Sequence, residues 1–97
     1  MANQLQLALQ NLGLTPLESR VYLACLGMGQ AKLQELTRVT KLPRGTIYSI
    51  LHKLQDKGLI SAHDVGKIMH YIPLDPAELS ARIKDRLYLL EQTIPEL

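Results

Sequence analysis

The stretch that decides the fold is residues 32–60, KLQELTRVTKLPRGTIYSILHKLQDKGLI. Its pattern predicts a short helix, a tight turn and a longer helix that begins at Pro43 and ends at Gly58. Proline fits the first turn of a helix because its missing N–H would have no partner there. Glycine commonly follows the last turn, because it adopts the left-handed conformation without strain. The spacing therefore predicts a helix-turn-helix.

The longer helix has two faces of opposite character. Apolar side chains at i, i+3, i+4 and i+7 form a stripe that we expect to be buried, namely Ile47, Ile50, Leu51 and Leu54. The other face carries cations and hydroxyls, namely Arg44, Thr46, Ser49, His52, Lys53 and Lys57. A helix anchored on one side and polar on the other can lie in the DNA major groove.

The positive charge of the chain is concentrated on this helix pair. The formal net charge of the 97 residues is only +2, which by itself does not indicate a nucleic-acid partner. Residues 31–58, however, hold six basic side chains against two acidic ones. Such a local excess is the electrostatic footprint that phosphate binding requires, although solvated helix faces also carry lysine and arginine.

Length and composition predict one ordinary globular domain. Its 97 residues are 46% hydrophobic and 21% charged, and they include neither Phe nor Trp. Cys25 is the single cysteine, so no intramolecular disulfide can form, and its apolar helical surroundings predict a buried, unreactive thiol. The amino terminus lacks the pattern of a signal peptide, and no apolar run approaches the ~20 residues of a membrane span. We therefore expect a cytoplasmic protein without a membrane partner.

Two further helices are predicted before the helix-turn-helix. Residues 3–12 are expected to form a short helix with a docking or dimer-facing stripe of Leu5, Leu9 and Leu12. The motif Thr15-Pro16-Leu17-Glu18 has the spacing of a capping box, in which Thr15 caps the next helix and Glu18 reaches back. The inward face of that helix is expected to consist of Leu17, Val21, Ala24, Cys25 and Met28.

The remaining pattern completes a winged helix-turn-helix. The shorter helix of the pair, residues 33–39, is expected to face inward with Leu33, Leu36 and Val39. Two short runs, residues 59–64 and 68–72, predict strands that are joined by a hairpin tip at residues 64–67. Residues 1–75 are therefore expected to form a mainly α (α+β) domain with a two-stranded wing.

Residues 76–97 predict a carboxy-terminal dimerisation helix. Asp75-Pro76 repeats the start signal of the earlier helix. Apolar residues then alternate at spacings of 4 and 3, which is the heptad seam of a coiled coil; they are Ile83, Leu87, Leu90 and Ile94. Pro95 is expected to end the helix. The seam reaches the end of these residues, as in a chain cut within a linker to a further domain.

Nine residues are candidates for DNA contact: Arg44, Thr46, Tyr48, Ser49, His52, Lys53, Lys41, Lys32 and Lys67. Arg44 is the first choice, because near the start of the helix its guanidinium can donate two hydrogen bonds to a guanine or bind a phosphate. The hydroxyls and the imidazole on the same face can donate to phosphates or base edges. Tyr48 has two interpretations, a phosphate contact or packing against the first helix. The lysines suit the phosphate backbone, with Lys67 reaching it from the wing.

The sequence offers little for catalysis or metal binding. His63, Asp64 and His70 lie near the predicted hairpin tip, but no cysteine or supporting ligand accompanies them. There is no glycine-rich phosphate loop and no nucleophile elbow. We therefore expect no metal, no cofactor and no enzymatic activity.

Several motifs carry a family resemblance: Leu12-Gly13-Leu14-Thr15, Glu18, Val21-Tyr22-Leu23-Ala24, Leu42-Pro43-Arg44, Ile47-Tyr48, Leu51, Leu54, Lys57-Gly58-Leu59-Ile60, Tyr71 and Pro76-Ala77-Glu78-Leu79. Together they resemble the amino-terminal DNA-binding domain of TrmB-like transcriptional regulators across residues 11–80. The resemblance implies a winged helix that binds operator DNA as a dimer, followed by a coiled linker. In many members the linker leads to an effector domain that senses sugars, so a small-molecule effector is expected only if a further domain exists.

Four positions depart from the family pattern. Lys32 stands where the family often has a capping Thr, Lys41 stands at the usual Gly of the turn, and Gly45-Thr46 replaces a common Ser-Lys. The operator sequence of other members is therefore not carried over to this chain.

Two hypotheses follow from the sequence. The first is sequence-specific binding of double-stranded DNA by a module of a dimeric transcriptional regulator. The alternative is a winged-helix protein-interaction module in a transcription or other complex. Salt separates them, because phosphate binding weakens steeply as salt rises whereas an apolar protein contact barely changes.

Overall fold

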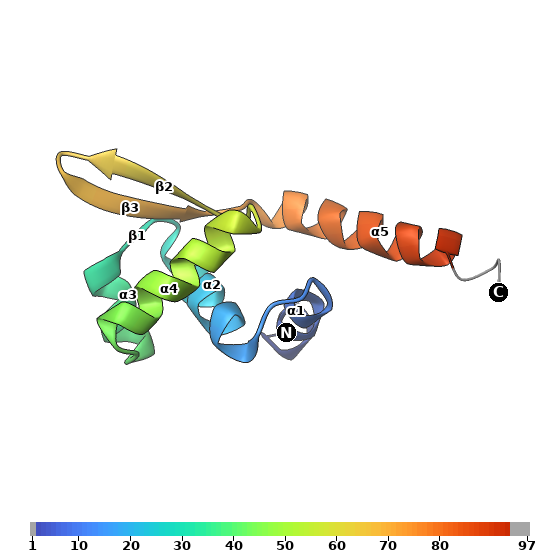
Figure 1. Ribbon diagram of the computed structural model, residues 1–97, viewed down its shortest axis with the longest axis horizontal. Helices are drawn as coiled ribbons and strands as arrows, with labels where there is room; N and C mark the ends of the chain where they lie inside the picture. The colour runs from blue at the N-terminus through green and yellow to red at the C-terminus, as the bar shows by residue number, and fades with distance from the viewer. Residues whose placement is uncertain (1, 94–97) are drawn as a thin grey trace.

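The computed structural model describes residues 2–93, without the side chains of residues 2–5, 76, 83, 86 and 93. Within this range the elements follow in the order α1 (Ala2–Asn11), α2 (Pro16–Met28), β1 (Ala31–Lys32), α3 (Leu33–Thr40), α4 (Arg44–Asp56), β2 (Ile60–Val65), β3 (Ile68–Pro73) and α5 (Pro76–Thr93). Helices α1 to α4 form a body from which the β2–β3 hairpin and α5 extend in opposite directions (Figure 1). The fold is the predicted winged helix-turn-helix.

The wing sheet has three strands, whereas the sequence predicted two. The strand order is β1-β3-β2, and both pairings are antiparallel. The added strand pairs Ala31 with Tyr71 and Lys32 with His70. Two residues are too few to show the alternation from which a strand is predicted, so only the tertiary pairing reveals β1.

The hairpin tip is shorter than predicted. Val65 still pairs with Ile68, so the turn consists of Gly66 and Lys67 alone. Their φ angles are 61° and 70°. Two positive φ angles are typical of the type I′ turn, whose twist matches that of the two strands. The turn places Lys67 at the outermost point of the wing.

The capping box at the start of α2 is confirmed. The Glu18 N–H donates to Thr15 Oγ1 at 3.1 Å, and the Thr15 N–H donates to Glu18 Oε1 at 2.8 Å. The predicted inward face of α2 is only partly correct. Leu17 is 42% exposed, whereas Glu18, Ser19 and Tyr22 are buried beside the expected Val21 and Cys25. The helix is turned so that Glu18 faces the body, and an ion pair described below makes this burial possible.

The body encloses one apolar core. All four residues of the predicted α4 stripe are buried, as is Leu36 of α3. Val39 was expected inside but is 52% exposed, and Thr40 takes the inward position. The buried Thr40 hydroxyl both donates and accepts, because Oγ1 donates to the Leu36 carbonyl at 2.6 Å and accepts the Leu42 N–H.

Helix α1 docks on its own domain. Leu9 is fully buried in the core, and Leu12 packs partly buried against it. The docking alternative is therefore correct for these two residues, while the side chain of Leu5 lies outside the described part of the chain.

Helix α5 extends away from the body and makes the molecule 52 Å long and 24 Å wide (Figure 1). The Asp75 carboxylate accepts the Ala77 N–H at 2.7 Å and so caps α5 as predicted. Among the α5 side chains that the structure describes, Leu79 alone is buried. None of the described helices combines the length and the apolar character that a membrane crossing needs.

Candidate nucleic-acid interface

The orientation of α4 follows from its buried stripe. Pro43 has extended φ and ψ angles and precedes the first helical residue, so α4 begins at Arg44, one residue later than expected. Because Ile47, Ile50, Leu51 and Leu54 face the core, the opposite face is turned to solvent. The predicted contact residues Arg44, Ser49, His52 and Lys53 are exposed there, and Thr46 is half-buried.

Tyr48 lies on the surface of α4. Its side chain is 52% exposed, and its ring meets the His52 ring edge to face, with the centroids 5.0 Å apart. The two rings hold each other on the outer surface of the helix, since residues i and i+4 are neighbours on one face. Half exposure leaves part of the Tyr48 side chain open to a ligand on this surface.

The start of α4, the segment that leads into α3 and the tip of the wing together line a groove. The groove holds about 450 Å³, and we call it the wing groove; it is lined by Lys32, Leu33, Gln34, Arg44, Tyr48, Lys67, Ile68, Met69 and Tyr71. Its cations come from three places, namely the start of α3, the start of α4 and the tip of the wing. The structure therefore brings together four of the predicted contact residues, Lys32, Arg44, Tyr48 and Lys67.

The other predicted contacts lie outside the wing groove. Thr46, Ser49, His52 and Lys53 continue along α4, and Lys53 lies in the last turn, where a cation also complements the helix dipole. Lys41 is exposed in the turn after α3 and has a φ of 60°. This left-handed conformation is one that a glycine adopts without strain and a lysine does not. Lys41 therefore ends α3 in a conformation that a glycine would adopt more easily.

Lys57 does not belong to the free polar face, contrary to the prediction. Its Nζ lies 2.9 Å from Glu18 Oε1 and donates to the Gly13 carbonyl at 3.1 Å. Glu18 is only 3% exposed, so this cation compensates a buried carboxylate. Burial by itself raises the pKa of Glu18, but the Thr15 N–H and the Lys57 ammonium outweigh it, and the pKa is lowered from 4.5.

The histidines of the wing do not form a metal site with Asp64. His63 and His70 pair across β2 and β3, but His63 Nε2 lies 3.1 Å from Ser61 Oγ and His70 Nδ1 lies 2.7 Å from Gln30 Nε2. Asp64 follows His63 in β2 and so points to the other face of the sheet. Within residues 2–93 no group of three such ligands is placed to hold a metal ion.

Cys25 is buried, and its Sγ donates to the Tyr71 carbonyl at 3.3 Å. Burial raises the pKa of the Cys25 thiol to about 11. The thiolate, which is the reactive form, is therefore scarce at neutral pH. Cys25 is part of the core, as the sequence predicted.

The predicted dimerisation seam is visible in part. Leu87 is 51% and Leu90 is 50% exposed on α5. The side chain of Ile83 and the whole of Ile94 lie outside the described part of the chain. Two apolar residues half exposed on a projecting helix form a surface that a second chain can cover, and pairing through it stays a prediction.

A family model described as "Sugar-specific transcriptional regulator TrmB" matches residues 9–77. The HTH-type sugar sensing transcriptional regulator TrmBL1 of Pyrococcus furiosus is 32% identical over 80 residues, which cover 81% of this chain and 23% of that protein. The DNA-binding HTH-type transcriptional repressor TrmBL2 of Thermococcus kodakarensis is 30% identical over 88 residues, which cover 82% of this chain and 33% of that protein. These residues thus span a third or less of each relative.

Solved structures agree with the fold. The structure of TrmBL2, an archaeal chromatin protein, has a TM-score of 0.77 at 24% identity and covers 99% of this chain and 38% of its own. The oxidized form of MarR from E. coli has a TM-score of 0.67 at 20% identity and covers 88% of this chain and 67% of its own. Both likenesses support a mainly helical winged helix-turn-helix with a carboxy-terminal helix.

Proposed function

This chain belongs to the TrmB family and is a DNA-binding winged helix-turn-helix domain of a transcriptional regulator, and on that premise we propose that it binds specific double-stranded DNA sequences as a dimer. The family is one of regulators rather than of enzymes, which agrees with the prediction from the sequence. A regulator acts where the genome is, so the proposal places the protein in the cytoplasm.

The observation that carries the proposal is the wing groove beside the polar face of α4. Lys32, Arg44 and Lys67 are contributed by three different elements and face one hollow. A single DNA strand that passes between α4 and the wing meets all three cations. Lys32 and Lys67 can neutralise its phosphates, which releases condensed counterions, and leave Arg44 for the bases. The apolar wall formed by Leu33 and Met69 suits the sugar of the same strand.

Base reading is assigned to the outer face of α4. Arg44 lies in the first turn, where a helix in the major groove approaches base edges. Its guanidinium can donate two hydrogen bonds to the O6 and N7 atoms of a guanine. Thr46, Ser49 and His52 extend the same face with shorter donors, while Lys41 and Lys53 suit flanking phosphates.

The dimer is assigned to α5. Leu87 and Leu90, with Ile83 and Ile94 in the same heptad pattern, would pair with the same residues of a second copy. A twofold dimer presents two α4 helices to one side of the duplex. We expect their half-sites to lie about one helical turn, roughly 34–36 Å, apart.

Sugar sensing is proposed only for a protein in which this domain is joined to a further one. TrmBL1 of P. furiosus is a sugar sensing regulator, but this chain matches only 23% of it.

Selection of bound duplexes from a random pool at two salt concentrations tests the proposal. We expect an enriched sequence with twofold symmetry and a steep loss of binding at the higher salt concentration. Arg44→Lys is the matched variant, because it keeps the positive charge but loses the two parallel N–H donors with which a guanidinium binds guanine. Recovery of no enriched sequence, with salt-independent binding to a protein instead, would favour the interaction-module alternative.

A further inference from the structure

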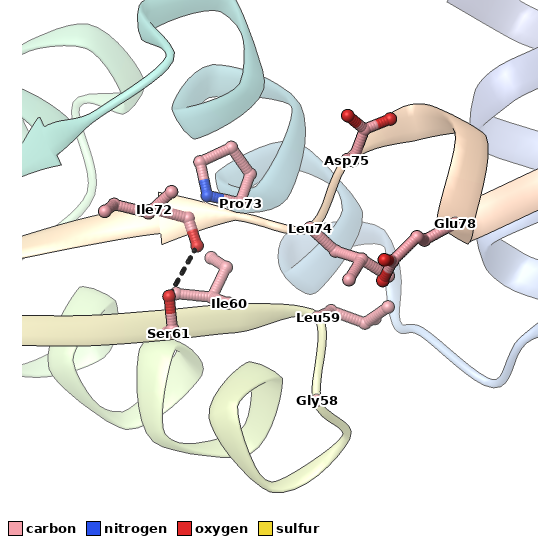
Figure 2. Close-up of a pocket in the computed structure, with 9 residues that line it drawn as sticks. All are labelled: Gly58, Leu59, Ile60, Ser61, Ile72, Pro73, Leu74, Asp75 and Glu78. Carbon is pink, nitrogen blue, oxygen red and sulfur yellow. Dashed lines mark hydrogen bonds between the residues drawn. The ribbon is translucent and has the colours of Figure 1, made fainter.

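The joint between the body and α5 is loosely packed. At the base of the wing, Leu74 and Asp75 lead from β3 into α5 (Figure 2). A hollow of about 350 Å³ lies there, lined by residues 58–61, 72–75 and Glu78. Leu79 is the one described side chain of α5 that is buried in the core. A helix that is anchored by one buried apolar side chain beside a hollow can pivot about that residue.

Arg82 supplies a second point of attachment. It lies about one helical turn beyond Leu79, and its Nη1 donates to the carbonyl of Lys57 at 3.1 Å. Lys57 follows the last residue of α4. The last carbonyls of a helix have no partner within the helix and carry its negative dipole end, so a guanidinium is well matched to this site.

Gly58 leaves room for this contact. Its φ is 73°, and a Cβ at this position would lie 3.0 Å from Arg82 Nη1 and 3.4 Å from Nη2. The guanidinium therefore rests directly on the backbone after α4. A side chain at position 58 would be strained and would also displace Arg82.

Lys57 is itself firmly held. Its ammonium is bound to Glu18 of α2 and to the carbonyl of Gly13, which precedes that helix. The chain just before α5 is held too, because the Tyr22 hydroxyl donates to the Leu74 carbonyl at 3.0 Å. The carbonyl that receives Arg82 thus belongs to a fixed part of the body, so the contact can fix the direction of α5.

We propose that Arg82 is a positioning residue, which sets the angle between α5 and α4 and thereby the half-site spacing that the dimer accepts. This inference rests on the proposed pairing through α5. About 12 residues of α5 lie from Arg82 onward, a lever of about 18 Å, so a tilt of about 10° moves its end by about 3 Å. The displacement is close to the 3.4 Å rise of one base pair.

The first test measures the dissociation constant for duplexes in which the two selected half-sites are moved apart or together by single base pairs. Wild-type protein is expected to prefer one spacing by tenfold or more. Arg82→Ala is expected to reduce this preference to threefold or less while binding a single half-site as wild type does. Arg82→Lys, which keeps a donor for the carbonyl, should restore most of the preference, and Lys84→Ala on the exposed part of α5 should leave it unchanged.

The second test needs neither DNA nor a dimer. Spin labels at Val39→Cys and Gln92→Cys, diluted with unlabelled protein, report the distance between the body and α5; Cys25 is buried and stays unlabelled. We expect a narrow distance distribution for the wild type, a broader or shifted one for Arg82→Ala, and recovery in Arg82→Lys.

The two tests separate the inference from the proposed function. If the wild type selects no DNA sequence, the proposed function fails, and the distance distributions still decide whether Arg82 positions α5. Identical distributions for wild type and Arg82→Ala overturn the inference. An unchanged spacing preference, or an equal loss of affinity for one and two half-sites, also overturns it.

Discussion

Helices α4 and α5 are both amphipathic, yet the fold treats them differently. Helix α4 buries four apolar side chains in the core of its own chain and presents its polar face, with Tyr48, to solvent. Helix α5 buries Leu79 among its described residues and leaves Leu87 and Leu90 half exposed. An apolar stripe with the 3.6-residue period of a single helix can be buried by the rest of its own domain, whereas a heptad seam is buried only against a second helix. The comparison shows that the position of α4 is fixed by the core, whereas that of α5 depends on a few contacts with the body and on a partner helix.

The largest effect is expected from breaking the anchor of α4. Leu54 is fully buried, so Leu54→Ala should lower the free energy of unfolding by about 2–5 kcal/mol, measured by urea denaturation. Leu90→Ala on α5 is the matched variant, and its effect should grow with protein concentration because it acts on pairing. Equal, concentration-independent losses in the two variants would contradict the distinction between the helices.

The ion pair at the end of α4 is the next contact to break. Lys57→Met leaves the carboxylate of Glu18 buried without its cation, and the partly exposed lysine suggests a loss of about 2 kcal/mol in unfolding free energy. Because the pKa of Glu18 is lowered in the folded state, its contribution is present above 4.5 and is lost as the pH falls below that value.

Urea unfolding between pH 7 and pH 3 checks the pH dependence. The wild type should lose stability on acidification through this range, and Lys57→Met should lose less. The double variant Glu18→Gln/Lys57→Met removes both charges and is the control. A wild-type stability that stays flat down to pH 3 would refute the role of the pair.

Removal of the arginine at the start of α4 should weaken DNA binding without affecting the fold. Arg44 is exposed, so Arg44→Ala should keep wild-type stability while specific affinity falls by about 1–3 kcal/mol. Fluorescence anisotropy with the selected duplex and a scrambled one measures the loss. A loss of the same size on both duplexes would move Arg44 from base reading to phosphate binding.

The smallest effect is expected at the tip of the wing. Lys67→Ala should lower the slope of log affinity against log salt by about 0.9, because one phosphate contact is lost. Lys84→Ala, on the part of α5 that faces solvent, should leave the slope unchanged. If Lys67→Ala also leaves it unchanged, the wing groove does not hold the DNA strand at that end.

Elements with strong local signals were predictable from the sequence. The α4 stripe, the capping box at Thr15 and the hairpin each depend on residues within a few positions of one another. Errors arose at helix ends, where Leu17 and Val39 were expected inside and are exposed. Periodicity predicts that a stripe exists, but a small rotation of the helix, decided by its neighbours, determines which end residues it includes.

The sequence supplied a list of candidate contact residues, which stays a prediction, but it did not supply their arrangement. Lys32, Arg44 and Lys67 were each proposed from local pattern, and only the fold brings them to one groove. Lys57 was placed on the free face because its partner, Glu18, lies 39 residues away in the sequence. The sequence around a lysine on a polar helix face is the same whether its ammonium is free in solvent or paired with a carboxylate from another element.

The sequence alone determined that α2 and α5 follow their capping residues, which face of α4 is buried and where positive charge is concentrated, because these depend on backbone geometry and side-chain polarity within one or two turns. The tertiary structure decided the third strand of the sheet, the burial of Glu18 against Lys57 and the contact of Arg82 with the end of α4. Those features join groups that are 25 to 40 residues apart. Pairing between such groups depends on which surfaces the whole chain brings together, and no local pattern records that.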